Sequence, residues 1–358
     1  MKKLDWYILS RFIGTFVYAL SLLLVIVIVF DISEKIEDFI RTKPTFGQII
    51  FDYYLNFIPY FANLFSHLFT FIAVIFFTSR MAARTEIVAI LSSGVSFNRF
   101  LRPYMIGAGI IALGSLFLNN WVIPHANQGR LDFEEKFVRN HYDYQARNIH
   151  RQIEPGTYTY MEGFNTSLKT GYKFSMERFK DNQMYYRMNA DHITWDSLRG
   201  VWKIYDYNIR IFKDLKEKMR FGQELDTVIP LNVKDFTQRT IFIEAMNYTE
   251  LNKFIDEQTM KGADNVEELK VAKQSRIAFP FSTFILTLIG VSLASRKVRG
   301  GIGMHIGLGL LISFSYILFM TVTSVFAQKG VTSAIVAVWI PNFVYLLLAL
   351  FLLRKAPK

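Results

Sequence analysis

Residues 12–30 read FIGTFVYALSLLLVIVIVF and contain no charged side chain. As an α-helix, this segment is about 28 Å long at 1.5 Å per residue, enough to cross the roughly 30 Å hydrocarbon layer of a bilayer. Because that layer holds no water, backbone groups inside it must bond to one another, which a helix achieves within a single segment. The stretch therefore predicts a membrane-spanning helix near the start of the chain.

Five further uncharged runs follow the first one. They are Tyr53–Ser79, Pro103–Gly129, Ile277–Ser295, Gly300–Gln328 and Gly330–Leu353. A chain that is 51% hydrophobic with 34 phenylalanines is not a disordered protein. No small-residue cleavage site follows the first run, so we expect an uncleaved first span and not a removed signal peptide. The sequence thus predicts a polytopic α-helical membrane protein with six transmembrane helices.

The positive charges of the short loops predict the orientation, because Lys and Arg gather on the cytoplasmic side of a membrane. One side carries Lys2, Lys3, Arg11, Arg80, Arg84, Arg99, Arg102, Arg296, Lys297, Arg299, Arg354, Lys355 and Lys358. The other side has only Lys35, Arg41, Lys43 and Lys329 in its short loops. Both termini are therefore expected in the cytoplasm. The net charge of +11 marks this face of the membrane protein and does not indicate nucleic-acid binding.

The long segment between the third and fourth runs, about residues 124–276, changes its periodicity. Residues 125–150 look like a helix that continues outward from span three. From about 152 to 245 the period becomes two, which predicts short antiparallel strands. The clearest strand-like stretches are 184–188, 193–195 and 201–211, with a turn at 196–200. After Asn247 the pattern is helical again. We therefore expect an inserted antiparallel β jelly-roll-like domain flanked by helices.

No catalytic group of residues is recognisable. The chain lacks the GxxxxGK[ST] phosphate loop, HExxH and GxSxG motifs, so it is not by itself a P-loop ATPase. The absence of cysteine excludes disulfides and thiolate ligands. His125, His141 and His150 do not have the spacing of a metal site on one helix face. We expect no cofactor, no metal and no enzymatic activity.

The polar and small residues inside the uncharged runs each allow two interpretations. Asn63 and His67 lie four residues apart on one helix face of span two. They would line a polar cavity or substrate path, or they would form hydrogen bonds between helices. Gly303 and Gly307 form a GxxxG pair at the start of span five, which allows another helix to approach closely. Whether that helix belongs to this chain or to a partner is open.

The loop between spans two and three predicts a short helix. Thr85 is placed to cap a helix that begins at Glu86, and Gly94 is a stop signal. Glu86 is the one acidic residue of a basic loop. It either complements the helix dipole or meets a basic residue of a cytoplasmic partner.

The chain resembles a known family along nearly its whole length. The resembling stretches are LDWYILSRF (4–12), YYLNFIP (53–59), RMAARTEIVAILSSGVSFNRFLRP (80–103), VIPHAN (122–127), YTELNKFI (248–255), RIAFPFSTFILTLIGVSLA (276–294), RGGIGMHIGLGLLISFSYI (299–317) and IPNFVYLLLALFLL (340–353). They resemble the LptF/LptG permeases, the membrane subunits of the ATP-binding-cassette machine that extracts lipopolysaccharide from the inner membrane of Gram-negative bacteria. The opening Leu4-Asp5-x-Tyr7-Ile8 favours the LptG branch.

The resemblance implies a division of the chain and a set of partners. It implies transmembrane helices in residues 1–124 and 277–358, a coupling helix at about 85–94, and a periplasmic domain at 125–276 with its jelly-roll at about 152–245. The implied partners are a cytoplasmic LptB-type ATPase dimer, a paralogous LptF/LptG permease, LptC/LptA-type periplasmic bridge proteins and lipopolysaccharide. The missing phosphate loop is then expected, because hydrolysis belongs to the ATPase subunit.

The resemblance also implies roles for individual residues. The ATPase-coupling residues would be Arg84, Glu86, Ile87, Ile90 and Leu91. Some family members carry lysines near the outer end of span one that contact lipid phosphates. The corresponding region here, FDISEKIEDFIRTKP (30–44), mixes basic and acidic residues. Substrate-binding candidates are Lys35, Arg41, Lys43, Asn63 and His67. It is an equally simple interpretation that these mixed charges mark the solvated end of a helix.

Two other functions are weighed against transport. A membrane-embedded lipid-modifying enzyme would need a carboxylate or histidine cluster at the outer interface, and the one dense acidic group there is Asp31, Glu34, Glu37 and Asp38. A structural anchor for a periplasmic complex would predict an ATPase whose rate does not respond to lipid. The export permease is the leading hypothesis.

Overall fold

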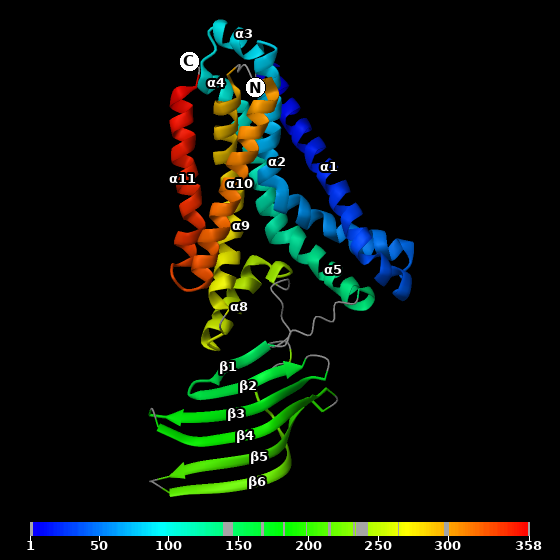
Figure 1. Cartoon of the computed structure of the whole chain (residues 1–358), viewed down its shortest axis with the longest axis vertical. Helices are drawn as coiled ribbons and strands as arrows, with labels where there is room; N and C mark the ends of the chain where they lie inside the picture. Colours follow the sequence, from blue (N-terminus) through cyan, green and yellow to red (C-terminus); the bar gives the residue numbers. More distant parts are fainter. Residues whose placement is uncertain are drawn as a thin grey trace. The chain divides into compact units, whose positions relative to one another are not determined.

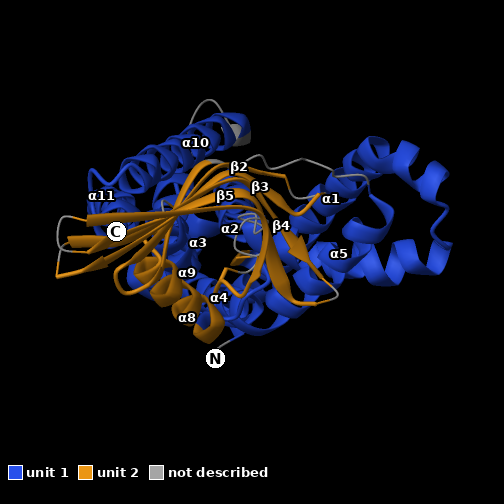
Figure 2. Cartoon of the chain, turned by 90° about the horizontal axis from the view of Figure 1, so that it is seen from below, with its two compact units in different colours: residues 1–139, 244–248, 267–358 blue, residues 140–243, 249–266 orange. Residues whose placement is uncertain are grey.

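The computed structural model describes residues 3–138, 146–165, 168–181, 183–197, 199–213, 216–231, 233, 243–263, 265–296 and 301–356. The chain forms two compact units (Figure 2). The helical unit comprises Met1–Arg139, Glu244–Tyr248 and Glu267–Lys358, and the β unit comprises Asn140–Ile243 and Thr249–Val266. The residues that extend outward from span three, up to Arg139, therefore belong to the helical unit.

Within the described residues, six helices are long and apolar enough to cross a membrane, which confirms the six predicted spans (Figure 1). They are α1 (Lys3–Thr42), η1 with α2 (Gln48–Tyr54, Leu55–Ala83), α4 with η2 and α5 (Phe97–Phe117, Leu118–Val122, Ile123–Phe137), α9 (Val266–Ala294), α10 (Gly301–Gln328) and α11 (Ala334–Lys355). The short helix α3 (Glu86–Ser92) joins the second span to the third, and α8 (Tyr248–Met260) precedes the fourth. The stretches η1 and η2 are π-helical, a wider winding that often accompanies functional sites.

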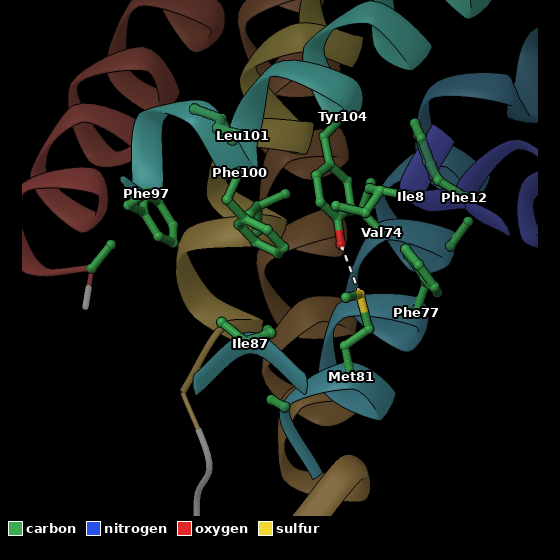
Figure 3. Packing of buried hydrophobic residues seen from close by; sticks show 14 of the residues in the cluster. Ile8, Phe12, Val74, Phe77, Met81, Ile87, Phe97, Phe100, Leu101 and Tyr104 are labelled. Carbon is green, nitrogen blue, oxygen red and sulfur yellow. Dashed lines mark hydrogen bonds between the residues drawn. The ribbon is translucent and has the colours of Figure 1, made fainter. Parts of the chain in front are cut away.

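The largest hydrophobic core of the helical unit joins α1, α2, α3 and α4 (Figure 3). Phe12 of α1 and Tyr104 of α4 are fully buried there, with their ring centroids 5.8 Å apart. The Tyr104 hydroxyl accepts a hydrogen bond from Thr78 Oγ1 at 3.0 Å, so a polar atom in an apolar core has its partner. Gly107 allows α1 and α4 to approach closely, because a Cβ at this position would lie only 2.6 Å from the Phe12 ring.

The β unit contains one antiparallel sheet in the order β1-β2-β3-β4-β5-β6. Its strands are β1 (Ala146–Glu154), β2 (Thr157–Asn165), β3 (Thr170–Lys180), β4 (Gln183–Asp196), β5 (Val201–Lys213) and β6 (Lys216–Thr227). Buried residues alternate along β2, as the period of two requires when one face of a sheet is covered. The covered face includes Phe174, Met188 and Trp202, and the Trp202 indole N–H donates to the Leu231 carbonyl at 3.0 Å.

The inserted antiparallel β-domain and its turn between β4 and β5 agree with the sequence prediction. The described strands form a meander, in which each strand pairs with its neighbours in sequence. They run from 146 to 227, so they begin earlier than the predicted range of about 152–245. A jelly-roll crossover does not occur among these described strands.

The prediction of a helix across residues 125–150 is wrong at Val138 and over residues 146–150. Helix α5 ends at Phe137, and Val138 is already extended at φ −110° and ψ 123°. His150 lies on β1, where the neighbouring Ile149 is buried opposite Met161 of β2. The sheet therefore overrides the local helical pattern, because pairing and burial of alternate residues stabilise the strand. His141 lies outside the described residues.

We expect a sharp difference between two glycines of α4. Replacing Gly107 by Ala should lower the melting temperature of the purified protein, because the new methyl group collides with the Phe12 ring. Gly114→Ala is the matched control, since a Cβ there meets nothing within 4 Å and Ala is favoured in a helix by about 1 kcal/mol. Equal melting temperatures for the two variants would contradict the close packing of α1 on α4.

Candidate functional site

Helix α3 begins with an unusual backbone conformation. Thr85 has φ +60°, in the left-handed region, and its hydroxyl donates to the Arg84 carbonyl at 2.6 Å. The expected Thr85 cap on α3 is therefore not made, because an N-cap side chain needs an extended backbone to reach the first amides of the helix. Gly94 has φ +85°, as expected of the residue that ends the helix.

The two faces of α3 differ in burial. Ile87 is 1% exposed and belongs to the large core, against which Ile90 and Leu91 also pack (Figure 3). Val88 is 60% exposed, and the Ala89 and Ser92 side chains are exposed beside it. The three predicted apolar coupling residues therefore hold α3 on its own chain. The surface that a partner would meet is formed by residues that the sequence had not singled out, although their spacing of one helical turn was a usable signal.

Glu86 is joined to α1. Its Oε2 accepts a hydrogen bond from the Tyr7 hydroxyl at 3.3 Å, and its Oε1 lies 3.9 Å from Nη1 of the exposed Arg84. The Glu86 side chain is 30% exposed to solvent. It is thus positioned to contact a partner while it also links α3 to the first span.

At the opposite end of α1, Lys35 lies in a cluster of polar side chains. Its Nζ is 2.9 Å from Asp31 Oδ1 and 3.2 Å from Glu134 Oε1, and it also bonds to the Tyr53 hydroxyl. Tyr54 donates to Asp31 Oδ2 at 3.0 Å. The Lys35 side chain is 13% exposed. Two carboxylates therefore neutralise this lysine, and they tie α1 to η1 and α5.

The other two basic candidates are more accessible. Arg41 pairs with Asp38 at 2.8 Å, but its side chain is 44% exposed. Lys43 is exposed just beyond the end of α1, at φ +51°. An exposed ion pair contributes little stability and exchanges its partner readily. Of the three predicted basic residues, Arg41 and Lys43 are therefore the ones available to an anionic ligand.

Asn63 and His67 contact neighbouring helices of the same chain. Asn63 Nδ2 donates to Asn119 Oδ1 at 2.8 Å, and its Oδ1 accepts from Ser115 at 2.6 Å. His67 is buried and its ring stacks on Phe279 of α9 with centroids 5.2 Å apart. The geometry supports the packing interpretation of both residues, because polar groups in a membrane bundle are stabilised by partners on adjacent helices.

The two glycines of the GxxxG pair face open space. A Cβ at Gly303 or Gly307 would meet nothing within 4 Å, whereas one at Gly309 would collide with Ile75 of α2. Gly309 is thus the glycine of α10 that packs within the helical unit. The GxxxG pair lies on a face of α10 where no described residue of this chain would come within 4 Å of a Cβ at either glycine.

One polar cluster was missed in the sequence. Residues 244–248, where the chain returns from the β unit, are held by side chains of three helices. Tyr60 of α2 donates to Glu244 Oε1 at 2.7 Å, and Arg276 of α9 donates to the Met246 carbonyl at 2.8 Å. Asn127 and Gln128 of α5 donate to the carbonyls of Glu244 and Ala245 at 3.3 and 3.2 Å. The signal in the sequence was weak, because three of the four pairs join residues more than a hundred positions apart.

These geometries suit binding and mechanical coupling. Among the described residues, no group of three or more His, Asp or Glu side chains could hold a metal ion. The acidic residues of the proposed enzyme site are in part committed to ion pairs, Asp31 with Lys35 and Asp38 with Arg41. Surface features among the described residues include an exposed face on α3, the open face of α10 at Gly303 and Gly307, and accessible cations at the end of α1.

Comparison with protein families finds a match over nearly the whole chain. Residues 6–355 match the family described as the lipopolysaccharide export system permease LptF/LptG, which covers both LptF and LptG. A search of curated proteins found no match.

The Lys35 cluster leads to a prediction about stability. Lys35→Ala should lower the free energy of unfolding by roughly 3 kcal/mol, because it leaves the partly buried Asp31 carboxylate without this cation and leaves Glu134 with only Arg130, at 3.9 Å. Arg41→Ala, which breaks an exposed pair on the same helix, should cost less than about 1 kcal/mol. Denaturant unfolding of the purified variants measures both. Equal losses would show that Lys35 is solvated like Arg41.

Glu244 leads to a prediction about pH. Burial raises the pKa of Glu244 above its ordinary value of 4.5, while the nearby Tyr60, Arg130 and Arg276 oppose that rise. Because the folded state binds this proton more tightly than the unfolded state does, the stabilisation is complete below the unfolded pKa and is lost as the pH rises through the folded one. Glu244→Gln keeps the acceptor for Tyr60 and cannot ionise.

The melting temperature of Glu244→Gln relative to the wild type should therefore increase as the pH rises above about 4.5. Subtracting the wild-type melting temperature at each pH cancels the contribution of all other titrating groups, because both proteins contain them. A difference that stays constant or falls with rising pH would show that the ionised carboxylate is the stabilised form.

Proposed function

Since the chain belongs to the LptF/LptG family of lipopolysaccharide export permeases and is an inner-membrane protein, we propose that it is one permease subunit of an ATP-binding-cassette transporter. In this role it extracts lipopolysaccharide from the inner membrane and passes it to a periplasmic bridge. The family is one of transporter subunits and not of catalysts, so the energy comes from a separate ATPase.

The cytoplasmic ATPase binds at α3 in this proposal. The Ile87 side chain is buried in the core and holds α3 in place, while Val88 lies on the surface. A partner can therefore bind to the exposed face of α3 without unfolding the helix. Glu86 adds a single negative charge to an otherwise basic loop, which suits a basic residue on the partner. The basic loops predict that this end of the helical unit is cytoplasmic, together with both termini (Figure 1).

A second permease packs against α10 in this proposal. Gly303 and Gly307 leave their backbone open to a helix from another chain, since nothing described in this chain approaches them. The predicted partner is a paralogous LptF/LptG chain, and two such chains together enclose the lipid between α1 and α10 of each.

The lipid enters beside α1, whose central residues offer an apolar surface. The exposed side chains are Val17, Tyr18, Leu22, Val25, Ile26, Val29 and Phe30. They suit acyl chains, while Arg41 and Lys43 provide accessible cations for the phosphates of the head group. Lys35 has a different role in this proposal, because its charge is already paired.

The β unit then receives the lipid on the periplasmic side and contacts the LptC/LptA-type bridge proteins. The observation that carries the whole proposal is the family match over residues 6–355, combined with the exposed face of an otherwise well anchored α3. Closure of the two ATPases would move α3, narrow the lipid cavity and drive the lipid outward.

The proposal is tested by placing a charge on the exposed face of α3. Val88→Asp should reduce co-purification of the ATPase roughly tenfold, the effect of losing about 1.4 kcal/mol of binding free energy. Val331→Asp is the matched control, because this valine is equally exposed but lies in the turn after α10. ATP-driven lipid release from vesicles should fall in Val88→Asp and in Glu86→Ala.

Three results would contradict the proposal. The first is that no ATPase co-purifies with the wild type. The second is that Val88→Asp and Val331→Asp retain equal amounts of ATPase. The third is an ATPase rate that does not respond to added lipopolysaccharide, which would instead indicate a structural anchor.

A further inference from the structure

Helix α1 is held by polar contacts at both ends and is mostly exposed in between. At the α3 end, Arg99 of α4 donates to the Asp5 carboxylate at 2.7 Å, and the Asp5 side chain is 7% exposed. Tyr7, two residues on, donates to Glu86 of α3. A charge-assisted bond with a buried carboxylate holds its geometry well, because breaking it would leave an uncompensated charge. The first turn of α1 thus touches both helices that follow the second span.

Apolar packing reinforces this junction. Ile8 and Phe12 of α1 are fully buried in the same cluster as Ile87 of α3 (Figure 3). Gly107 lets the Phe12 ring lie directly against the α4 backbone. A displacement of α3 therefore moves residues that pack on α1, since a close-packed core transmits strain.

The far end of α1 has a second set of fixed contacts. The Lys35 cluster joins it to η1 and α5, and the Thr42 hydroxyl donates to the Phe137 carbonyl at 3.0 Å. Phe39 adds edge-to-face contacts with Tyr53 and Phe133, with centroids 6.3 and 6.1 Å apart. Two distant parts of the helical unit are therefore connected through one helix.

The part of α1 between these two ends is a continuous helix. Helix α1 has 40 residues, so it is about 60 Å long, and it contains no proline. Helices α2, α4, α9 and α11 each contain an internal proline, which weakens or kinks a helix. Only 11% of the most apolar window of α1 is buried, and Leu20, Val27 and Ile28 are the central residues that pack partly against the neighbouring clusters.

We propose that α1 is the lever that carries movement of α3 to the opposite end of the helical unit, and that Asp5 and Tyr7 are the positioning residues that join it to α3 and α4. This inference rests on the proposed function, because it takes α3 as the element that the ATPase moves. It assigns Glu86 a second contact, inside its own chain. It also assigns Lys35 to the output end of the lever.

The test measures movement at the far end of α1 directly. The chain has no cysteine, so nitroxide labels can be placed at Ile40→Cys and Val331→Cys, both at exposed positions. The labelled chain is combined with the ATPase, and the distance between the labels is measured by pulsed electron resonance before and after addition of ATP. A shift is expected in the otherwise wild-type protein.

Tyr7→Phe and Asp5→Asn should each reduce that shift by at least half while the ATPase still co-purifies. Tyr18→Phe is the matched control, because it removes a hydroxyl from the exposed middle of the same helix and should leave the shift unchanged. The exchange Asp5→Arg with Arg99→Asp should restore the shift lost in Asp5→Asn. A role in stability alone would not produce this pattern.

The lever is overturned if the shift is absent in the wild type, or equal in Tyr7→Phe, Tyr18→Phe and wild type, although the ATPase is bound. Tyr7→Phe keeps the test decisive if Asp5→Asn does not fold, because it removes one hydrogen bond from a partly exposed ring. Failure of the wild-type chain to bind an ATPase is a separate result that contradicts the proposed function itself.

Discussion

The absence of water in the middle of a bilayer is the constraint on which the rest of the helical unit depends. It requires the backbone to form its hydrogen bonds within each span, and it requires polar side chains there to find partners on neighbouring helices. Asn63 with Asn119 and Thr78 with Tyr104 are such pairs. They show how a mostly apolar bundle accommodates buried amides and hydroxyls.

The same constraint moves the charges to the ends of the helices, where they become points of attachment. Asp5 with Arg99 lies at one end of α1, and Lys35 with Asp31 and Glu134 lies at the other. Residues 244–248 are held in a similar way by Tyr60 and Arg276. A bundle with apolar centres and polar fixed points can shift its spans while the connections between them persist, as a transport subunit requires.

Much of the fold could be predicted because its signals are local. The six spans follow from uncharged runs, and the β4–β5 turn follows from Asp196 to Gly200 between alternating residues. The predicted helix was wrong over residues 146–150 because β1 depends on a partner strand, which local periodicity does not show. The Thr85 cap was wrong because the loop adopts a left-handed turn there, and composition does not indicate backbone handedness.

The functional surfaces divide in the same way. The sequence by itself determined that this is a six-span membrane protein with an inserted β-domain and a short helix at Glu86, since helix length, hydropathy and charge are properties of consecutive residues. Only the tertiary structure decided that Ile87 is an anchor and Val88 a surface residue, that Lys35 is already paired, and that Gly303 and Gly307 face outward. Those outcomes depend on which distant residues share a face or neutralise a charge, and such contacts exist only once the chain has folded.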